Sequence, residues 1–177
     1  MKKDIKDLKV LISSNDLYKR IKELADEINN TYPKNELLNL ICILKGGIMF
    51  FAEISKHLKM PVKMEFISLS SYGSSEKSSN QVKANNLNLP EFCNENVLIV
   101  EDIIDTGLSM DFLLKFINKN CKAKTVKIAA LLNKKCARKF NIKPDFSAFD
   151  VEDKFVAGFG LDYQQIYRNL DYIGYFE

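Results

Sequence analysis

Runs of branched apolar residues without polar alternation recur at residues 38–44, 97–100 and 125–132. Such runs are typical of strands buried on both faces, as in a parallel sheet that helices cover. Helical spacing of apolar residues follows two of them, in residues 48–58 and from Phe112 onward. The pattern therefore predicts an α/β fold with a central, mostly parallel sheet flanked by helices.

Weaker patterns complete this outline. An amphipathic helix is expected over residues 15–30, with Ser14 as its N-cap and one apolar stripe. The stripe consists of Leu17, Ile21, Leu24, Ala25 and Ile28. Residues 62–70 alternate and predict a strand, a further short strand begins at Pro144, and residues 171–176 alternate as a terminal strand would.

Composition narrows the class of protein. The 177 residues suit one domain, and 46% hydrophobic with 28% charged residues is typical of a globular protein without a membrane segment. No signal-peptide core follows the first residues, so a cytoplasmic protein is expected. The four cysteines lack paired spacing and the one histidine, His57, stands alone, which favours neither zinc nor disulfides. A net charge of +3 does not by itself indicate nucleic-acid binding.

A turn rich in acids and hydroxyls follows the apolar run at residues 97–100. It contains Glu101, Asp102, Asp105, Thr106, Gly107, Leu108 and Ser109. Since neighbouring strand side chains point to opposite faces, Glu101 and Asp102 should reach to either side of the strand end. Gly107 permits a tight turn, and the N–H groups of the helix that follows are free to bind an anion.

An anion site beside three carboxylates suggests one kind of ligand. A sugar phosphate could place its phosphate in the turn and its hydroxyls, or a hydroxyl-bound Mg²⁺, against the acids. A βα connection with acidic capping residues is the simpler alternative. The full pattern, Glu-Asp-x-x-Asp-Thr-Gly-x-Ser after a buried strand, is much harder to explain as capping alone.

Two further strand ends carry candidate chemistry. Lys45, Gly46 and Gly47 could close on an anion, and Lys134 and Arg138 follow the third apolar run. Solvated loops are an alternative for both segments. Because parallel strands end at a common edge, where open α/β folds bind ligands, these groups should meet there.

Val97 to Met110 resembles the phosphoribosyl pyrophosphate (PRPP) signature of the type I phosphoribosyltransferases, and the chain from about Leu40 onward is similar to hypoxanthine-guanine phosphoribosyltransferases. The resemblance implies one domain over residues 1–177. Its core would span about 10–145, and a small hood would comprise about 146–177 plus the N-terminal segment. A mobile lid loop would begin at Ser71 and Tyr72. This lid departs from the family pattern, with Ser79-Asn80 in place of Thr-Arg.

The resemblance also implies roles for individual residues. The PRPP ribose and phosphate would be bound by Glu101, Asp102, Thr106, Gly107, Leu108 and Ser109. Pyrophosphate would be bound by Lys45, Gly46, Arg138 and Arg168, with a cis peptide at the pair Lys45-Gly46. The purine would be bound by Lys134 at its 6-oxo group, by stacking on Phe155 and by the backbone of Val156. Mg²⁺ would be held by Glu101, Asp102 and Asp162.

The implied reaction is attack of a purine N9 on C1 of PRPP, which gives IMP or GMP and releases pyrophosphate. Mg²⁺, Lys45 and Arg138 would neutralise the leaving group, and Asp105 would take or share the N7 proton, a role that partial burial would favour. The family implies a homo-oligomer, a dimer or tetramer, and leaves open the preference among hypoxanthine, guanine and xanthine. The second hypothesis is a regulator of the same fold that senses PRPP or a nucleotide and binds nucleic acid, but the sequence shows neither a basic face nor a DNA-binding module.

Overall fold

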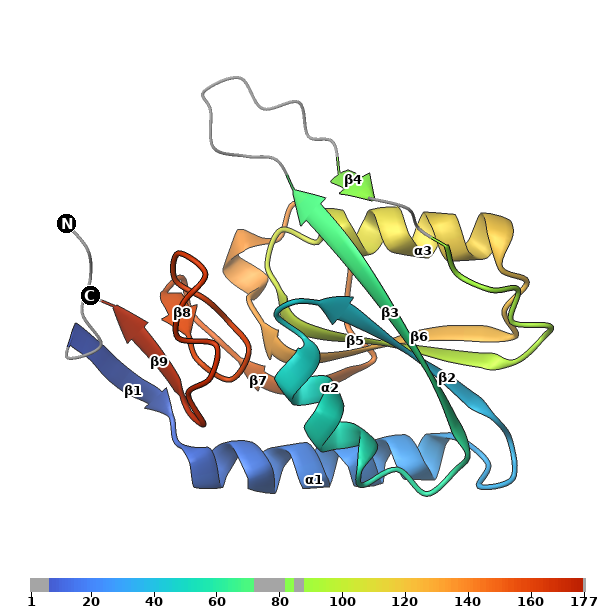
Figure 1. Ribbon diagram of the computed structural model, residues 1–177, viewed down its shortest axis with the longest axis horizontal. Coiled ribbons are helices and arrows are strands. Elements are labelled where there is room, and N and C mark those ends of the chain that lie inside the picture. Colours follow the sequence, from blue (N-terminus) through green and yellow to red (C-terminus); the bar gives the residue numbers. More distant parts are fainter. Residues whose placement is uncertain (1–6, 72–81, 85–87, 177) are drawn as a thin grey trace.

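A six-stranded sheet forms the centre of the molecule (Figure 1). The computed structural model describes residues 7–71, 82–84 and 88–176. The strand order is β4-β3-β2-β5-β6-β7, with β4 antiparallel and the other five parallel. The strands are β2 (Leu38–Leu44), β3 (Val62–Ser71), β4 (Val82–Ala84), β5 (Asn96–Ile104), β6 (Thr125–Asn133) and β7 (Phe146–Asp150). The α/β fold with a mostly parallel sheet is confirmed.

Helices cover both faces of this sheet (Figure 1). Helices α1 (Ser14–Thr31) and α2 (Ile48–Ser55) lie on one face, and α3 (Leu108–Asn120) lies on the other. None of the helices that the structure describes is long and apolar enough to cross a bilayer. Strands β2, β5 and most of β6 thus form a buried middle layer, whereas β3 is partly exposed.

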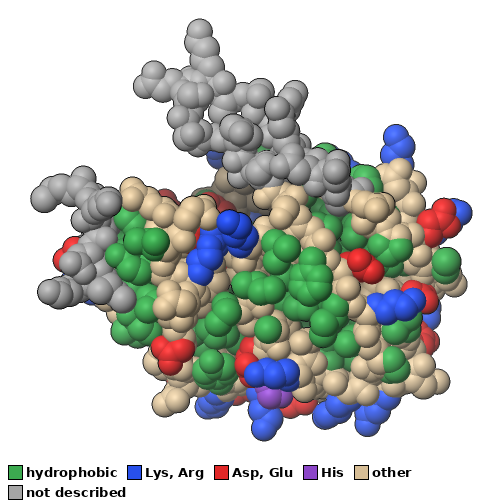
Figure 2. All heavy atoms as spheres, viewed as in Figure 1, with side chains coloured by type: hydrophobic (Ala, Val, Ile, Leu, Met, Phe, Trp, Pro, Cys, Tyr) green, Lys and Arg blue, Asp and Glu red, His purple; other side chains and the backbone are tan. Residues whose placement is uncertain are grey.

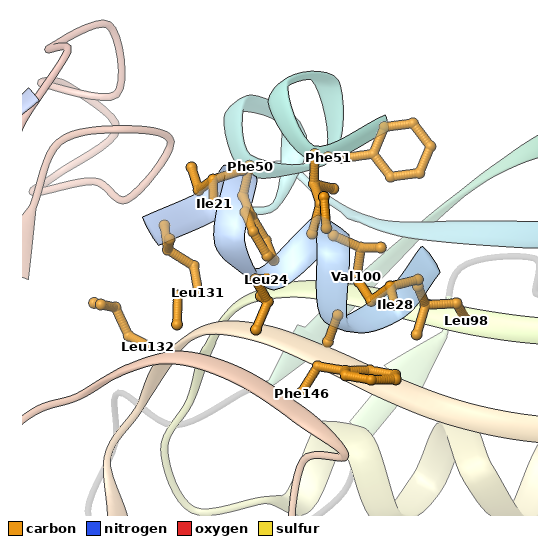
Figure 3. Close-up of a cluster of buried hydrophobic side chains, with 14 of the residues drawn as sticks. Ile21, Leu24, Ile28, Phe50, Phe51, Leu98, Val100, Leu131, Leu132 and Phe146 are labelled. Atoms are coloured by element: carbon orange, nitrogen blue, oxygen red, sulfur yellow. The ribbon is translucent and has the colours of Figure 1, made fainter. Parts of the chain in front are cut away.

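Alternate residues of the central strands enter two different cores. Leu98 and Val100 pack with α1 and α2 in the larger cluster, which Figure 3 shows around Leu24 and Phe50. Val97, Ile99, Ile41 and Ile43 pack with α3. A strand between two helical layers must be apolar on both faces, which explains the unbroken apolar runs in the sequence.

A second, three-stranded sheet forms the hood beside the central sheet (Figure 1). Its order is β1-β9-β8 and its pairing is antiparallel, with β1 (Leu8–Ile12), β8 (Phe155–Ala157) and β9 (Ile173–Phe176). Strand β9, near the C-terminus, pairs on both sides, with β1 from the N-terminal segment and with β8. Both ends of the chain thus contribute to one small sheet.

Several expected boundaries shift. Ser13, not Ser14, caps α1, since its hydroxyl accepts from the N–H of Asp16 at 3.2 Å. Strand β7 belongs to the central sheet because it pairs with β6, although the sequence assigned its residues to the hood. Strand β5 does not end before Glu101 but continues to Ile104, since its ladder with β6 extends that far.

Candidate active site

Three candidate segments follow strands β2, β5 and β6 at the same edge of the sheet. They are the Lys45-Gly46-Gly47 turn, the loop between β5 and α3, and the residues after Asn133. The parallel register of these strands brings their carboxyl ends together. The expectation that acids, glycines and basic residues meet at one edge is therefore correct for these segments.

The loop between β5 and α3 walls a cavity of about 230 Å³. The lining residues are Glu101, Ile103, Ile104, Asp105, Thr106, Gly107, Leu108, Ser109 and Met110. Gly107 has a φ of 86°, which glycine adopts without steric cost, and it precedes the first turn of α3. The Thr106 hydroxyl accepts from the N–H of Leu108 at 3.3 Å. A cavity at a helix start is suited to an anion, because the first N–H groups of a helix have no partner within the helix.

Gly46 is the point at which the turn after β2 meets the strand end of β5. A Cβ atom built on Gly46 would lie 1.7 Å from Oδ2 of Asp102, so no side chain fits there. Asp102 is buried, and its Oδ1 accepts from the N–H of Ile103 at 2.9 Å. The cis peptide bond of this turn joins Leu44 and Lys45, which corrects the expected position at Lys45-Gly46 by one residue.

The hood reaches the same turn through a second glycine. A Cβ atom on Gly160, whose φ is 100°, would lie 2.0 Å from the carbonyl oxygen of Gly46. Positive φ and this close approach both require glycine at position 160. The hood, the turn after β2 and the end of β5 are thereby stacked in direct contact.

Glu101 precedes Asp102 on β5, and the two carboxyl groups lie close enough to interact, so the expectation that they reach to opposite sides of the strand is not confirmed. Glu101 lines the cavity, and its Oε2 is buried with no hydrogen-bond partner among the described residues. Burial and the neighbouring charge of Asp102 raise the pKa of Glu101 well above the usual range of a carboxyl. Burial, together with both carboxylates, raises the pKa of the Cys42 thiol to about 12.

Lys134 connects the end of β6 to the segment before β8. Its side chain is 12% exposed, and Nζ lies 2.7 Å from Oδ1 of Asp153. Burial alone would lower its pKa, but the hydrogen bond to Asp153 and the charges of Asp105 and Asp153 outweigh burial and raise it. Lys134 is thus a charged donor in the electrostatic field of Asp105. Asp105 itself is exposed, not partly buried as expected.

The hood presents an aromatic surface close to this lysine in space, since Nζ of Lys134 also donates to the carbonyl oxygen of Lys154, next to Phe155, at 3.4 Å. The ring of Phe155 is 54% exposed and meets the edge of Tyr163 at a centroid distance of 5.6 Å. Val156 is buried, and its backbone belongs to the pairing of β8 with β9. A flat ligand could stack on Phe155.

Asp162 and Arg168 form an ion pair in the hood, with 2.6 Å between Oδ1 and Nη2. Arg168 also donates to the carbonyl oxygen of Gly160 at 2.8 Å, which ties the pair to the stacked glycines. Glu101, Asp102 and Asp162 do not converge. Within residues 7–71, 82–84 and 88–176, no three acidic, histidine or cysteine side chains form a group that could hold a metal ion.

Binding roles were also predicted for Arg138 and for the lid residues. Arg138 lies behind the β5–α3 loop and bonds to protein atoms, as described below. Ser71 ends β3, whereas Tyr72 and the Ser79-Asn80 pair lie outside the described residues. No role was predicted for Asn133, which is buried and accepts from Arg138 at 2.7 Å. The sequence signal that could have pointed to Asn133 is its position as a polar residue at the end of an apolar strand.

Glu101→Gln tests the unpartnered carboxylate. Because the folded-state pKa is raised, the folded protein holds the proton more tightly than the unfolded chain, so this group lowers stability as pH rises above the unfolded value. In chelator-treated protein, we expect the variant to match the wild type near pH 4 and to be more stable near pH 8 by ~1–3 kcal/mol, or several degrees in Tm. Exposed Glu23→Gln is the control and should show no such pH-dependent gain. A Glu101→Gln variant that is less stable at pH 8 would contradict the burial of an unmatched charge.

Comparisons with known proteins agree with this geometry. The family model described as a phosphoribosyl transferase domain matches residues 10–164. The hypoxanthine-guanine phosphoribosyltransferase of Bacillus subtilis is 44% identical over 174 residues, which cover 98% of this chain and 94% of that protein.

Solved structures give the same result. A hypoxanthine phosphoribosyltransferase from Staphylococcus aureus superposes with a TM-score of 0.89 at 32% identity, covering 97% of this chain and 93% of that one. The Trypanosoma cruzi hypoxanthine phosphoribosyltransferase, solved in complex with the product IMP, gives 0.87 at 33% identity over 99% and 98%. The chain therefore belongs to the phosphoribosyl transferase family, among the hypoxanthine-guanine phosphoribosyltransferases.

Proposed function

We propose that this chain is a purine salvage enzyme that transfers the 5-phosphoribosyl group from PRPP to hypoxanthine or guanine, giving IMP or GMP and pyrophosphate. The observation that carries the proposal is the pairing of a helix-start cavity with the unpartnered carboxylate of Glu101. A phosphate alone would be repelled by that acid. A ligand with hydroxyls next to its phosphate can place the phosphate in the cavity and donate hydrogen bonds from the hydroxyls to the carboxylate.

In this proposal the 5′-phosphate occupies the cavity at Thr106, Gly107, Leu108 and Ser109. Glu101 and Asp102 accept hydrogen bonds from the ribose hydroxyls. Glu101 lines the cavity and Asp102 lies against Gly46, so together they would hold the ribose between the cavity and the Gly46 turn. Lys45, Gly46 and Arg168 would surround the pyrophosphate, since the stacked glycines bring the hood against that turn.

The purine would stack on Phe155, next to the backbone of Val156. Lys134 would donate to the 6-oxo group, exchanging its contact with Asp153 for the base. An adenine 6-amino group would leave this mostly buried ammonium unpaired, which is a reason for rejecting adenine. Asp105 lies close enough to Lys134 to influence its pKa, so a base held by the lysine would be near a carboxylate able to take or share the N7 proton.

Mg²⁺ fits the chemistry of the donors, because Glu101 and Asp102 offer hard oxygen atoms and one of these is unpartnered. Bound there, Mg²⁺ would neutralise charge on the departing pyrophosphate. Asp162, already paired with Arg168 and with the N–H of Gln165, would act on that ion only after releasing a partner.

The regulatory alternative receives no support from the relatives, which are named as transferases. We also propose a cytoplasmic location, which the cysteines fit. Cys42, Cys93, Cys121 and Cys136 are all free thiols, as is usual in a reducing compartment.

Incubation of the purified protein with PRPP, Mg²⁺ and each of hypoxanthine, guanine, xanthine and adenine tests the function. We expect nucleotide formation from hypoxanthine or guanine and none from adenine. Asp105→Asn should lower kcat by about 10²–10⁴-fold while the Kd of PRPP changes little, because only proton transfer is lost. Absence of product with every oxopurine would reject the proposal, and an unchanged kcat would reject the role of Asp105.

We also propose that the protein is a homo-oligomer. Hydrophobic side chains gather on the face formed by α2 and β3, where Ile48, Met49, Met64 and Phe66 are exposed (Figure 2). The ring of Phe66 packs on Phe51 at 5.3 Å, which orders it. An exposed apolar patch of this kind favours a protein partner, and a second copy of the chain is the occupant proposed here.

Light scattering tests the oligomer. We expect wild-type protein to have the mass of a dimer or tetramer, and Phe66→Glu to shift it toward the monomer because a charge would be desolvated in the interface. Val10→Glu, at an exposed apolar position on the hood, is the matched control and should leave the mass unchanged. A wild-type monomer at micromolar concentration would contradict the proposal.

A further inference from the structure

Three consecutive carbonyl groups of the β5–α3 loop are bound by one segment, residues 133–142. The Ile104 oxygen accepts from the N–H of Lys134 at 3.0 Å. The Asp105 oxygen accepts from Nε of Arg138 at 3.0 Å. The Thr106 oxygen accepts from the N–H groups of residues 139 and 140, at 3.0 and 3.1 Å. This segment therefore binds the carbonyl groups of the last residue of β5 and of the first two residues of the loop.

These bonds determine which way the loop amides point. In a trans peptide the N–H is directed opposite to the preceding carbonyl. The N–H groups of Asp105, Thr106 and Gly107 therefore point away from residues 133–142. The same residues line the cavity at the start of α3. Fixing the carbonyls behind the loop thus presets its donors for an anion in front.

The Arg138 side chain is the centre of this support. Its Nη2 donates to the oxygen of Ile104 at 3.1 Å and to Oδ1 of Asn133 at 2.7 Å, while Nη1 donates to the oxygen of Ile142. Together with the bond from Nε, the planar guanidinium donates four hydrogen bonds to protein acceptors. A lysine ammonium has no such fork of donors and could not reproduce the arrangement.

The position of Arg138 also separates it from the ligand side. It does not line the cavity of the β5–α3 loop but a different cavity of about 450 Å³, together with Asn133 and Ile142. Its Cδ would lie 3.2 Å from a Cβ atom on Gly107, so its stem packs directly behind the turn. Asn133, which accepts from the guanidinium, is itself fixed by donating to Asp150 at 2.8 Å.

We propose that Arg138 is a positioning residue for the 5′-phosphate loop and does not bind pyrophosphate. This inference rests on the proposed function, since it assigns the 5′-phosphate to the loop. The same segment binds the loop through Lys134, the proposed purine donor. The phosphate loop and the purine donor are therefore held in one frame by residues 133–142.

Binding measurements with three ligands separate the two roles. IMP carries the 5′-phosphate but no pyrophosphate, PRPP carries both, and inorganic pyrophosphate lacks the sugar phosphate. For Arg138→Met we expect the Kd of IMP and of PRPP to rise by a similar factor, about 10–100-fold, with pyrophosphate binding in Mg²⁺ unchanged. Weakened pyrophosphate and PRPP binding with unchanged IMP binding would overturn the proposal.

Arg138→Lys is the second variant, because it keeps the charge and most of the stem. A positioning role predicts a loss of IMP affinity close to that of Arg138→Met, whereas substantial rescue by lysine would indicate that charge alone matters and would contradict the proposal. Lys135→Met removes an exposed neighbouring cation and should change each Kd less than about twofold. Wild-type protein that binds neither IMP nor PRPP would instead reject the proposed function.

Discussion

The contact at Gly46 is the constraint on which the rest of the site depends. The carboxylate of Asp102 occupies the volume that any side chain at position 46 would need, and the carbonyl oxygen of Gly46 in turn touches Gly160 of the hood. Three segments far apart in sequence are brought within contact distance because two of them have no side chain at the crossing. A buried acid is thereby held against the turn that, in our proposal, receives pyrophosphate.

Elsewhere in the site, polar side chains have few or exposed hydrogen-bond partners. Among the residues that the structure describes, one buried oxygen of Glu101 has no partner, and Lys134 is paired with a mostly exposed Asp153. Behind the loop the situation is the reverse, since its carbonyls and the Arg138 guanidinium are well provided with partners. Hydrogen bonds thus hold the loop in place on its carbonyl side, whereas the groups that are incompletely bonded face the proposed substrates.

Much of the fold could be predicted from the sequence because a sheet between two helical layers requires unbroken apolar strands, as at residues 97–100. The position of the acids at the sheet edge followed from the same pattern. The extent of β5 could not be predicted, because pairing with β6 carries the strand through Glu101 and Asp102. Likewise, no local signal distinguishes an arginine that faces a ligand from Arg138, which faces three backbone carbonyls. Its two partners on the far side of this contact, Ile104 and Asp105, lie 34 and 33 positions away in the chain.

A double-mutant cycle at positions 46 and 102, read as the free energy of unfolding, tests the central contact most directly. Gly46→Ala should cost ~1–3 kcal/mol in the wild-type background, since its Cβ would overlap Asp102. In the Asp102→Ala background the same change should be close to neutral, because the colliding carboxylate is gone. An equal cost in both backgrounds would show that Gly46 is needed for some other reason, and the stacked arrangement would not be the basis of the site.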